Sequence, residues 1–137
     1  MKKYITKAKN TCWRDCLACL LEIEPRRVPD FAKLYDDKYM DFTRDWLEKF
    51  GKGLVYIPTK NFMETDAMRD NPPMGPSGYS IGHLTMVDGE FNHVVICYNG
   101  GVLWDNGDDR HEEYGVMVEY FVLYDLEPKK AKKIKKH

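Results

Sequence analysis

Hydrophobic residues near the start of the chain recur with the spacing of an amphipathic helix. From residue 12 to residue 23 they follow an i, i+3, i+4, i+7 pattern. Further apolar side chains widen the hydrophobic face of this helix, so that only a narrow polar side remains. That polar side consists of Arg14, Asp15, Ala18 and Glu22. So wide a stripe predicts a central helix that is buried over most of its surface, and Pro25 is expected to end it.

After Gly53 the patterning changes from helical to strand-like. Before this point, shorter helices are predicted at 29–35 and 41–50. The strands and hairpin turns predicted after it are strands 54–57, 79–87, 93–98, 101–105 and 116–124, with turns at 88–89 and 99–101. Residues 60–80, with three prolines and two glycines, are predicted to form a long functional loop. Helices followed by an antiparallel sheet of about four or five strands predict the α+β class.

Composition limits the classes of partner. The 137 residues are expected to form one domain, 1–127, with a basic, solvated tail at 128–137. Because 21 basic residues balance 22 acidic ones, we expect no nucleic-acid partner. No apolar run suits a signal peptide or a membrane span, and the four cysteines then favour reduced thiols in the cytoplasm. Nothing in the pattern indicates an oligomeric state.

Cys12 lies where the first helix is predicted to begin, with Asn10 or Thr11 as its N-cap. The nucleophilic form of cysteine is the thiolate, and an ordinary thiol is only a few per cent ionised at neutral pH. The partial positive charge and unpaired N–H groups of a helix N-terminus favour the anion. Cys16 and Cys19 lie further inside the helix and lack this help. The alternative for a lone cysteine is a small buried hydrophobic residue.

His93 and Asp105 supply the other parts of a cysteine hydrolase. His93 opens one predicted strand, and Asp105 closes the next. If the turn at 99–101 has two or three residues, His93 lies opposite Asp105 or Asn106, within the ~5–8 Å reach of paired side chains. A carboxylate or amide there would orient the imidazole through its second nitrogen, as the third member of a triad does.

Two blocks of sequence carry a family resemblance. The first block reads Cys12-Trp13, then Leu20-Leu21-Glu22-Ile23, then Val28-Pro29-Asp30-Phe31. The second block has a glycine-rich approach at 75–82, then His93-Val94-Val95 and, twelve residues after the histidine, Asp105. Together they resemble papain-like cysteine hydrolases, particularly the small phage and bacterial ones related to the peptidase C39 and NlpC/P60 groups. The likeness covers about two-thirds of the chain in order and spacing.

The resemblance implies a papain-like α+β fold with Cys12 as nucleophile, His93 as general base and then acid, and Asp105 as the orienting residue. It implies cleavage of an amide or isopeptide bond in a peptide or protein substrate through an acyl-thioester intermediate. Transfer of the acyl group to an amine instead of water would use the same residues. No metal or cofactor is required.

The chain departs from the family pattern at the oxyanion site. The family often places a glutamine about six residues before the cysteine, where this chain has Thr6. Asn10 or the backbone N–H of Cys12 would have to hold the oxyanion in its place. The usual Asp-Pro after the second strand is here Asp105-Asn106, so Asn106 is the alternative third member.

Other histidines and the tryptophans are candidates for the same region. His83 follows Ile81-Gly82 on a strand and is a rival base that could line the substrate cleft; His111 is a second rival but lies in an acidic loop. The residues expected to shape the cleft, together with the 60–80 loop, are Trp13, His83, Trp46 and Trp104.

The cysteine spacing also admits metal chemistry. Cys12-x3-Cys16-x2-Cys19 has the spacing of the radical S-adenosylmethionine iron–sulfur motif, which needs a loop so that the thiolates can converge. Here the three cysteines lie in a helical pattern, which also separates them too widely for a zinc site. We therefore expect no metal.

The competing function is a papain-like scaffold with weak or no activity that binds and sequesters a partner protein, as a phage-encoded effector would. The missing glutamine favours this binding function. The complete set of Cys12, His93 and Asp105 favours the enzyme.

Overall fold

The computed structural model describes residues 1–4, 12–59, 75–86, 92–105 and 114–126, and in these residues three α-helices precede a five-stranded antiparallel sheet. The predicted α+β class is therefore confirmed. The helices are α1 (Cys12–Leu21), α2 (Phe31–Tyr35) and α3 (Tyr39–Glu48), with short 3-10 helices at Pro25–Arg27 and Asp36–Lys38. The strands are β1 (Lys52–Pro58), β2 (Tyr79–Met86), β3 (Asn92–Tyr98), β4 (Gly101–Trp104) and β5 (Tyr114–Asp125).

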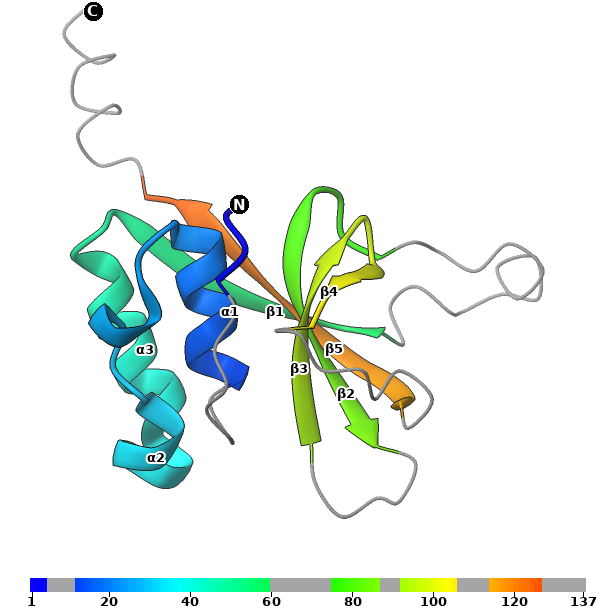
Figure 1. Cartoon of the computed structure of the whole chain (residues 1–137), viewed down its shortest axis with the longest axis horizontal. Coiled ribbons are helices and arrows are strands. Elements are labelled where there is room, and N and C mark those ends of the chain that lie inside the picture. The colour runs from blue at the N-terminus through cyan, green and yellow to red at the C-terminus, as the bar shows by residue number, and fades with distance from the viewer. Residues whose placement is uncertain (5–11, 60–74, 87–91, 106–113, 127–137) are drawn as a thin grey trace, which may run out of the picture.

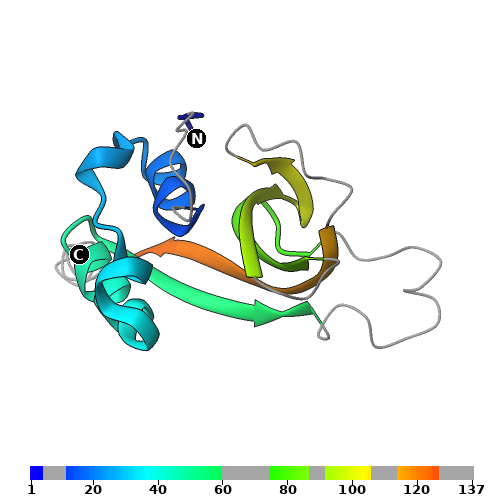
Figure 2. The same ribbon diagram turned by 60° about the horizontal axis from the view of Figure 1, so that its bottom comes forward.

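The helices gather on one side of the molecule and the curled end of the sheet on the other (Figure 1). The strand order is β1-β5-β2-β3-β4, and every neighbouring pair is antiparallel. The long β5 pairs with β2 through its N-terminal part and with β1 through its C-terminal part. As a result β1 and the end of β5 extend along the helices, while β2, β3 and β4 curl away from them (Figure 2).

Two hydrophobic clusters occupy opposite faces of the sheet. Because side chains alternate between faces along a strand, Ile96 and Cys97 of β3 belong to different clusters. The larger cluster joins the helices to the sheet and includes Trp13, Leu17, Phe31, Leu47, Ile81, Ile96 and Phe121. The smaller cluster consists of buried Leu84, Val95, Cys97 and Tyr120. Since α1 packs against β3, this arrangement sets Cys12 beside the strand that carries His93.

Helix α1 is buried on more sides than its hydrophobic pattern predicted. Asp15 and Ala18, both expected on the polar side, are 1% and 0% exposed. The helix also ends at Leu21, before the proline that was expected to stop it. Glu22 adopts a left-handed conformation (φ 58°), and the N–H of Ile23 donates to the carbonyl of Ala18 at 3.0 Å. This is the hydrogen bond of a Schellman motif, so backbone geometry ends the helix.

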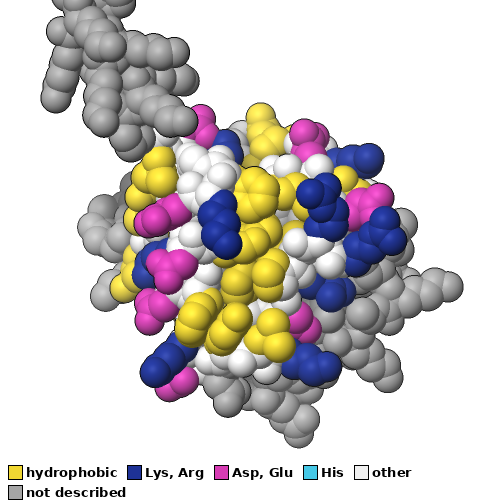
Figure 3. Space-filling model, turned by 90° about the vertical axis from the view of Figure 1, so that its left-hand side faces the viewer, with side chains coloured by type: hydrophobic (Ala, Val, Ile, Leu, Met, Phe, Trp, Pro, Cys, Tyr) yellow, Lys and Arg dark blue, Asp and Glu magenta, His cyan; other side chains and the backbone are white. Residues whose placement is uncertain are grey.

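Aromatic side chains of α2 and α3 form a partly exposed cluster on the helical side of the molecule. The rings of Tyr35 and Phe42 stack with centroids 3.9 Å apart, and Phe31 meets Trp46 edge-on at 5.6 Å. Figure 3 shows hydrophobic side chains gathered on this side. Trp46 packs in this cluster, and the cleft role expected for it stays a prediction.

The predicted elements agree with the structure to within two residues at each end. Most of the 60–80 loop, the 88–89 turn and the 128–137 tail lie outside the described residues. In the part of the chain that is described, no helix is long and apolar enough to cross a membrane.

Candidate active site

His93, at the start of β3, and Asp105, just after β4, are in direct contact. Nε2 of His93 lies 2.8 Å from Oδ1 of Asp105. Both side chains are buried, so water competes little for this hydrogen bond. The sequence predicted an imidazole beside a carboxylate or amide here, and the structure places the carboxylate there.

A tight hairpin between β3 and β4 brings the two residues together. Asn99 and Gly100 form its two-residue turn, and both have positive φ (51° and 87°), as a type I′ turn requires. The side-chain oxygen of Asn99 accepts a hydrogen bond from the N–H of Gly78 at 2.8 Å, which ties the turn to the start of β2.

A β-bulge decides which residue meets the imidazole. The β3–β4 register shifts between Ile96 and Cys97, so two residues of β4 oppose one residue of β3. Because side chains alternate, the extra residue turns Asp105 to the face of His93. An unbulged hairpin would have set Asn106 opposite His93 instead. The bulge therefore selects the carboxylate from the two candidates that the sequence left open.

Cys12 approaches the same imidazole from the helical side. It is the first residue of α1 and is partly exposed. Burial lowers the pKa of His93, but hydrogen bonds with Asp105 and Cys12 and the negative charges of both outweigh this effect and raise the pKa from 6.5 to about 9. Since Nε2 faces Asp105, Nδ1 is the nitrogen left for the thiol. At neutral pH the imidazole is protonated, which is the form that stabilises a thiolate.

Tyr114 is a further member of the site, which the sequence did not reveal. Its hydroxyl donates a hydrogen bond to Oδ2 of Asp105, and its ring centroid lies 6.2 Å from that of His93. The carboxylate is therefore held at both oxygens. Tyr114 opens β5, which pairs with β2 and not with β4, so no local pattern in the sequence points to this contact.

The other three cysteines are buried in the core. Burial raises the pKa of the Cys16 thiol well above its usual value, with further increases from the neighbouring thiols and carboxylates. Burial likewise raises the pKa of Cys19, and it raises that of Cys97 to about 12. These groups stay neutral and covered, so Cys12 is the thiol of this chain that a reagent can reach.

Trp13, the residue after Cys12, packs in the core next to the site. It is 5% exposed, and its ring meets Tyr39 edge-on at 5.8 Å and Phe121 at 5.0 Å. Its indole N–H donates to Oγ1 of Thr43 at 3.1 Å. Trp13 is therefore a core residue that fixes the start of α1, and the expectation that it lines a cleft is not met.

The remaining candidates have other partners or lie outside the described residues. Trp104 is partly buried against the cluster between helices and sheet, on the face opposite to Asp105. His83 is hydrogen-bonded to Glu119. Asn10, Asn106 and His111 lie outside the described residues.

Among the described residues, no three His, Cys, Asp or Glu side chains gather in a way that could hold a metal ion. Comparisons of the chain with models of protein families, with curated proteins and with solved structures gave no match. What the site can do must therefore follow from its own geometry.

Proposed function

We propose that the protein is a cysteine-dependent hydrolase with a papain-like arrangement, which cleaves an amide or isopeptide bond. The observation that carries this proposal is the placement of His93 between a partly exposed thiol, Cys12, and a buried carboxylate, Asp105. A nucleophile, a base and an orienting group in this order are the requirements of covalent acyl transfer.

The reaction would proceed in two stages. The Cys12 thiolate attacks the substrate carbonyl carbon, and the C–N bond breaks as His93 gives its proton to the leaving amine. His93 then takes a proton from water, which attacks the acyl-thioester and releases the acid and the thiolate. Asp105 keeps the ring oriented through both stages, and its charge stabilises the imidazolium.

The start of α1 would supply the hydrogen-bond donor for the oxyanion. The first N–H groups of a helix have no carbonyl partner within the helix, and they carry partial positive charge. The N–H of Cys12 would hold the oxyanion of the tetrahedral intermediate. The role expected for Asn10 remains a prediction.

Alkylation with iodoacetamide tests the thiol chemistry without a known substrate. An unassisted thiol is less than about one per cent ionised near pH 6, so it reacts slowly there. We expect rapid modification of the wild type near pH 6, mapped by peptide mass to Cys12, and modification at least tenfold slower in His93→Gln. Tyr98→Phe, at an exposed residue of the same strand, is the control and should react like the wild type.

A second measurement separates an enzyme from a binding scaffold. Substrate proteins should form a covalent thioester with the wild type and none with Cys12→Ala. Slow reaction of Cys12 with iodoacetamide near pH 6, together with no thioester, would support the inactive scaffold that binds a partner.

A further inference from the structure

A second histidine–carboxylate pair lies next to the proposed active site and has no part in the mechanism above. Nδ1 of His83 on β2 is 2.8 Å from Oε2 of Glu119 on β5, and the two residues are register partners. Their side chains are 20% and 23% exposed, so solvent and ligands reach both. Within the described part of the chain, His83 is the side chain that is hydrogen-bonded to Glu119.

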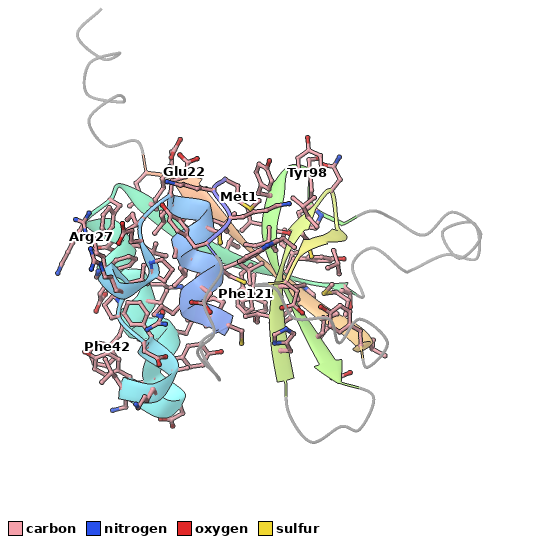
Figure 4. All side chains as sticks on the ribbon, viewed as in Figure 1. Met1, Glu22, Arg27, Phe42, Tyr98 and Phe121 are labelled. Atoms are coloured by element: carbon pink, nitrogen blue, oxygen red, sulfur yellow. The ribbon has the colours of Figure 1, made fainter. Side chains whose placement is uncertain are left out.

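The register places this pair close to His93 but on the other face of the sheet. His83 pairs with Val94, the residue that follows His93. Glu119 lies two residues from Phe121 on β5 and therefore shares its face, which is the face against which Trp13 packs. Figure 4 shows Phe121 at this junction between α1 and the sheet.

Tyr39 connects the pair to the nucleophile. Burial raises the pKa of Tyr39, and the negative charges of Glu119 and Cys12 raise it further, so its hydroxyl lies within electrostatic reach of both. Its ring is also in contact with Trp13, the neighbour of Cys12 in the chain. Glu119, Tyr39 and Cys12 thus belong to one continuous region.

An exposed aromatic residue lies on the same face of the sheet as the Glu119 carboxylate. Tyr56 on β1 is the register partner of Phe121, so it lies on the same face as Glu119, and it is 53% exposed. A partly desolvated carboxylate beside aromatic rings attracts ammonium and guanidinium groups through charge-assisted hydrogen bonds and cation–π contacts. The imidazole contacts one carboxylate oxygen, Oε2, which leaves Oε1 for such a ligand.

We propose that the His83–Glu119 pair recognises a cationic side chain of the substrate, lysine or arginine, near the bond that Cys12 attacks. This inference rests on the proposed hydrolase function and adds the class of substrate to it. Glu119 provides the charge, and His83 is a positioning residue that holds the carboxylate toward the ligand.

Peptide vinyl sulfones, which alkylate an active-site thiol irreversibly, provide the test. Each series contains three peptides that differ at a single residue, which is lysine, norleucine or glutamate. Three series are made, in which this residue is the first, second or third from the vinyl sulfone. In one series the wild type should react at least tenfold faster with lysine than with norleucine, and slowest with glutamate. In Glu119→Gln the lysine preference should fall to near one while the norleucine rate stays within twofold. Glu119→Asp should recover part of the preference.

Glu48→Gln, which removes an exposed carboxylate at the end of α3, is the control and should keep the full lysine preference. The inference is overturned if the wild type shows no lysine preference in any series, or if Glu119→Gln keeps the preference. Iodoacetamide reports separately on the thiol. If iodoacetamide does not label Cys12 rapidly near pH 6, the hydrolase proposal and the inference built on it both fail. Rapid labelling of Cys12 without a lysine preference among the vinyl sulfones refutes the inference alone.

Discussion

Tyr114 of β5 donates a hydrogen bond to Asp105 after β4, although β2 and β3 separate these two strands in the sheet. The curl of the sheet brings β5 and the end of β4 together (Figure 2). The curvature of the sheet therefore takes part in orienting His93, because the carboxylate that holds the imidazole is itself held from a distant strand.

Tyr114→Phe should raise the pKa of His93 above about 9, because Asp105 loses a competing donor and accepts more strongly from the imidazolium. The free energy of unfolding should fall by about 1–3 kcal/mol, the usual cost of losing a hydrogen bond to a charged group. NMR titration of the His93 ring and urea unfolding measure the two effects. Tyr98→Phe, at an exposed tyrosine of β3, should change neither. A loss of stability with unchanged titration of His93 would reduce Tyr114 to a structural role.

Asp105→Asn should lower the pKa of His93 below about 9, because the substitution removes the carboxylate whose hydrogen bond and negative charge raise that pKa. Turnover of any substrate should fall by about 10²–10⁴-fold, as expected for loss of the group that orients the base. Alkylation of Cys12 near pH 6 should also slow. Asp125→Asn, at an exposed carboxylate paired with Lys52, should leave both rates unchanged. Equal rates in Asp105→Asn and the wild type would exclude Asp105 from the mechanism.

The stability of the fold should depend on pH through His93. Its pKa is about 9 in the folded protein, above the ordinary value of 6.5, so folding favours the protonated ring. The resulting stabilisation is fully present below pH 6.5 and is lost as the pH rises through about 9. The free energy of unfolding in urea should therefore decline across this window in the wild type and decline less in His93→Gln. Identical slopes would contradict the elevated pKa.

Gly82→Ala should destabilise the protein by about 1–3 kcal/mol through overpacking. A Cβ at this position on β2 would lie 2.6 Å from Sγ of Cys97 and 2.8 Å from Sδ of Met117. Gly101→Ala is the matched control, because the nearest atom to its Cβ is 3.8 Å away. Urea unfolding of the two variants compares them directly. Equal stability would show that the Cys97 side of the sheet is loosely packed.

Local patterns were sufficient to predict the elements of this fold. The strand-like patterning after Gly53 identified all five strands, and Asn99-Gly100-Gly101 identified the hairpin that joins His93 to Asp105. The hydrophobic stripe of α1 likewise predicted a central helix. These features depend on residues that are neighbours in the sequence.

Features that depend on strand pairing could not be predicted. The bulge that turns Asp105 toward His93 leaves no composition signal, and both Tyr114 and the His83–Glu119 pair depend on the non-local pairing of β2 with β5. Asp15 was assigned to a polar surface because a carboxylate is normally exposed, whereas packing around α1 buries it.

The most direct test of the account is an NMR titration of the His93 ring in the wild type and in Cys12→Ala. We predict that the wild-type imidazole remains protonated at pH 8 and titrates near 9, and that its pKa falls when the thiol is removed. An imidazole that titrates near 6.5 in both proteins would show that Cys12 and His93 do not interact, and would contradict the proposed active site.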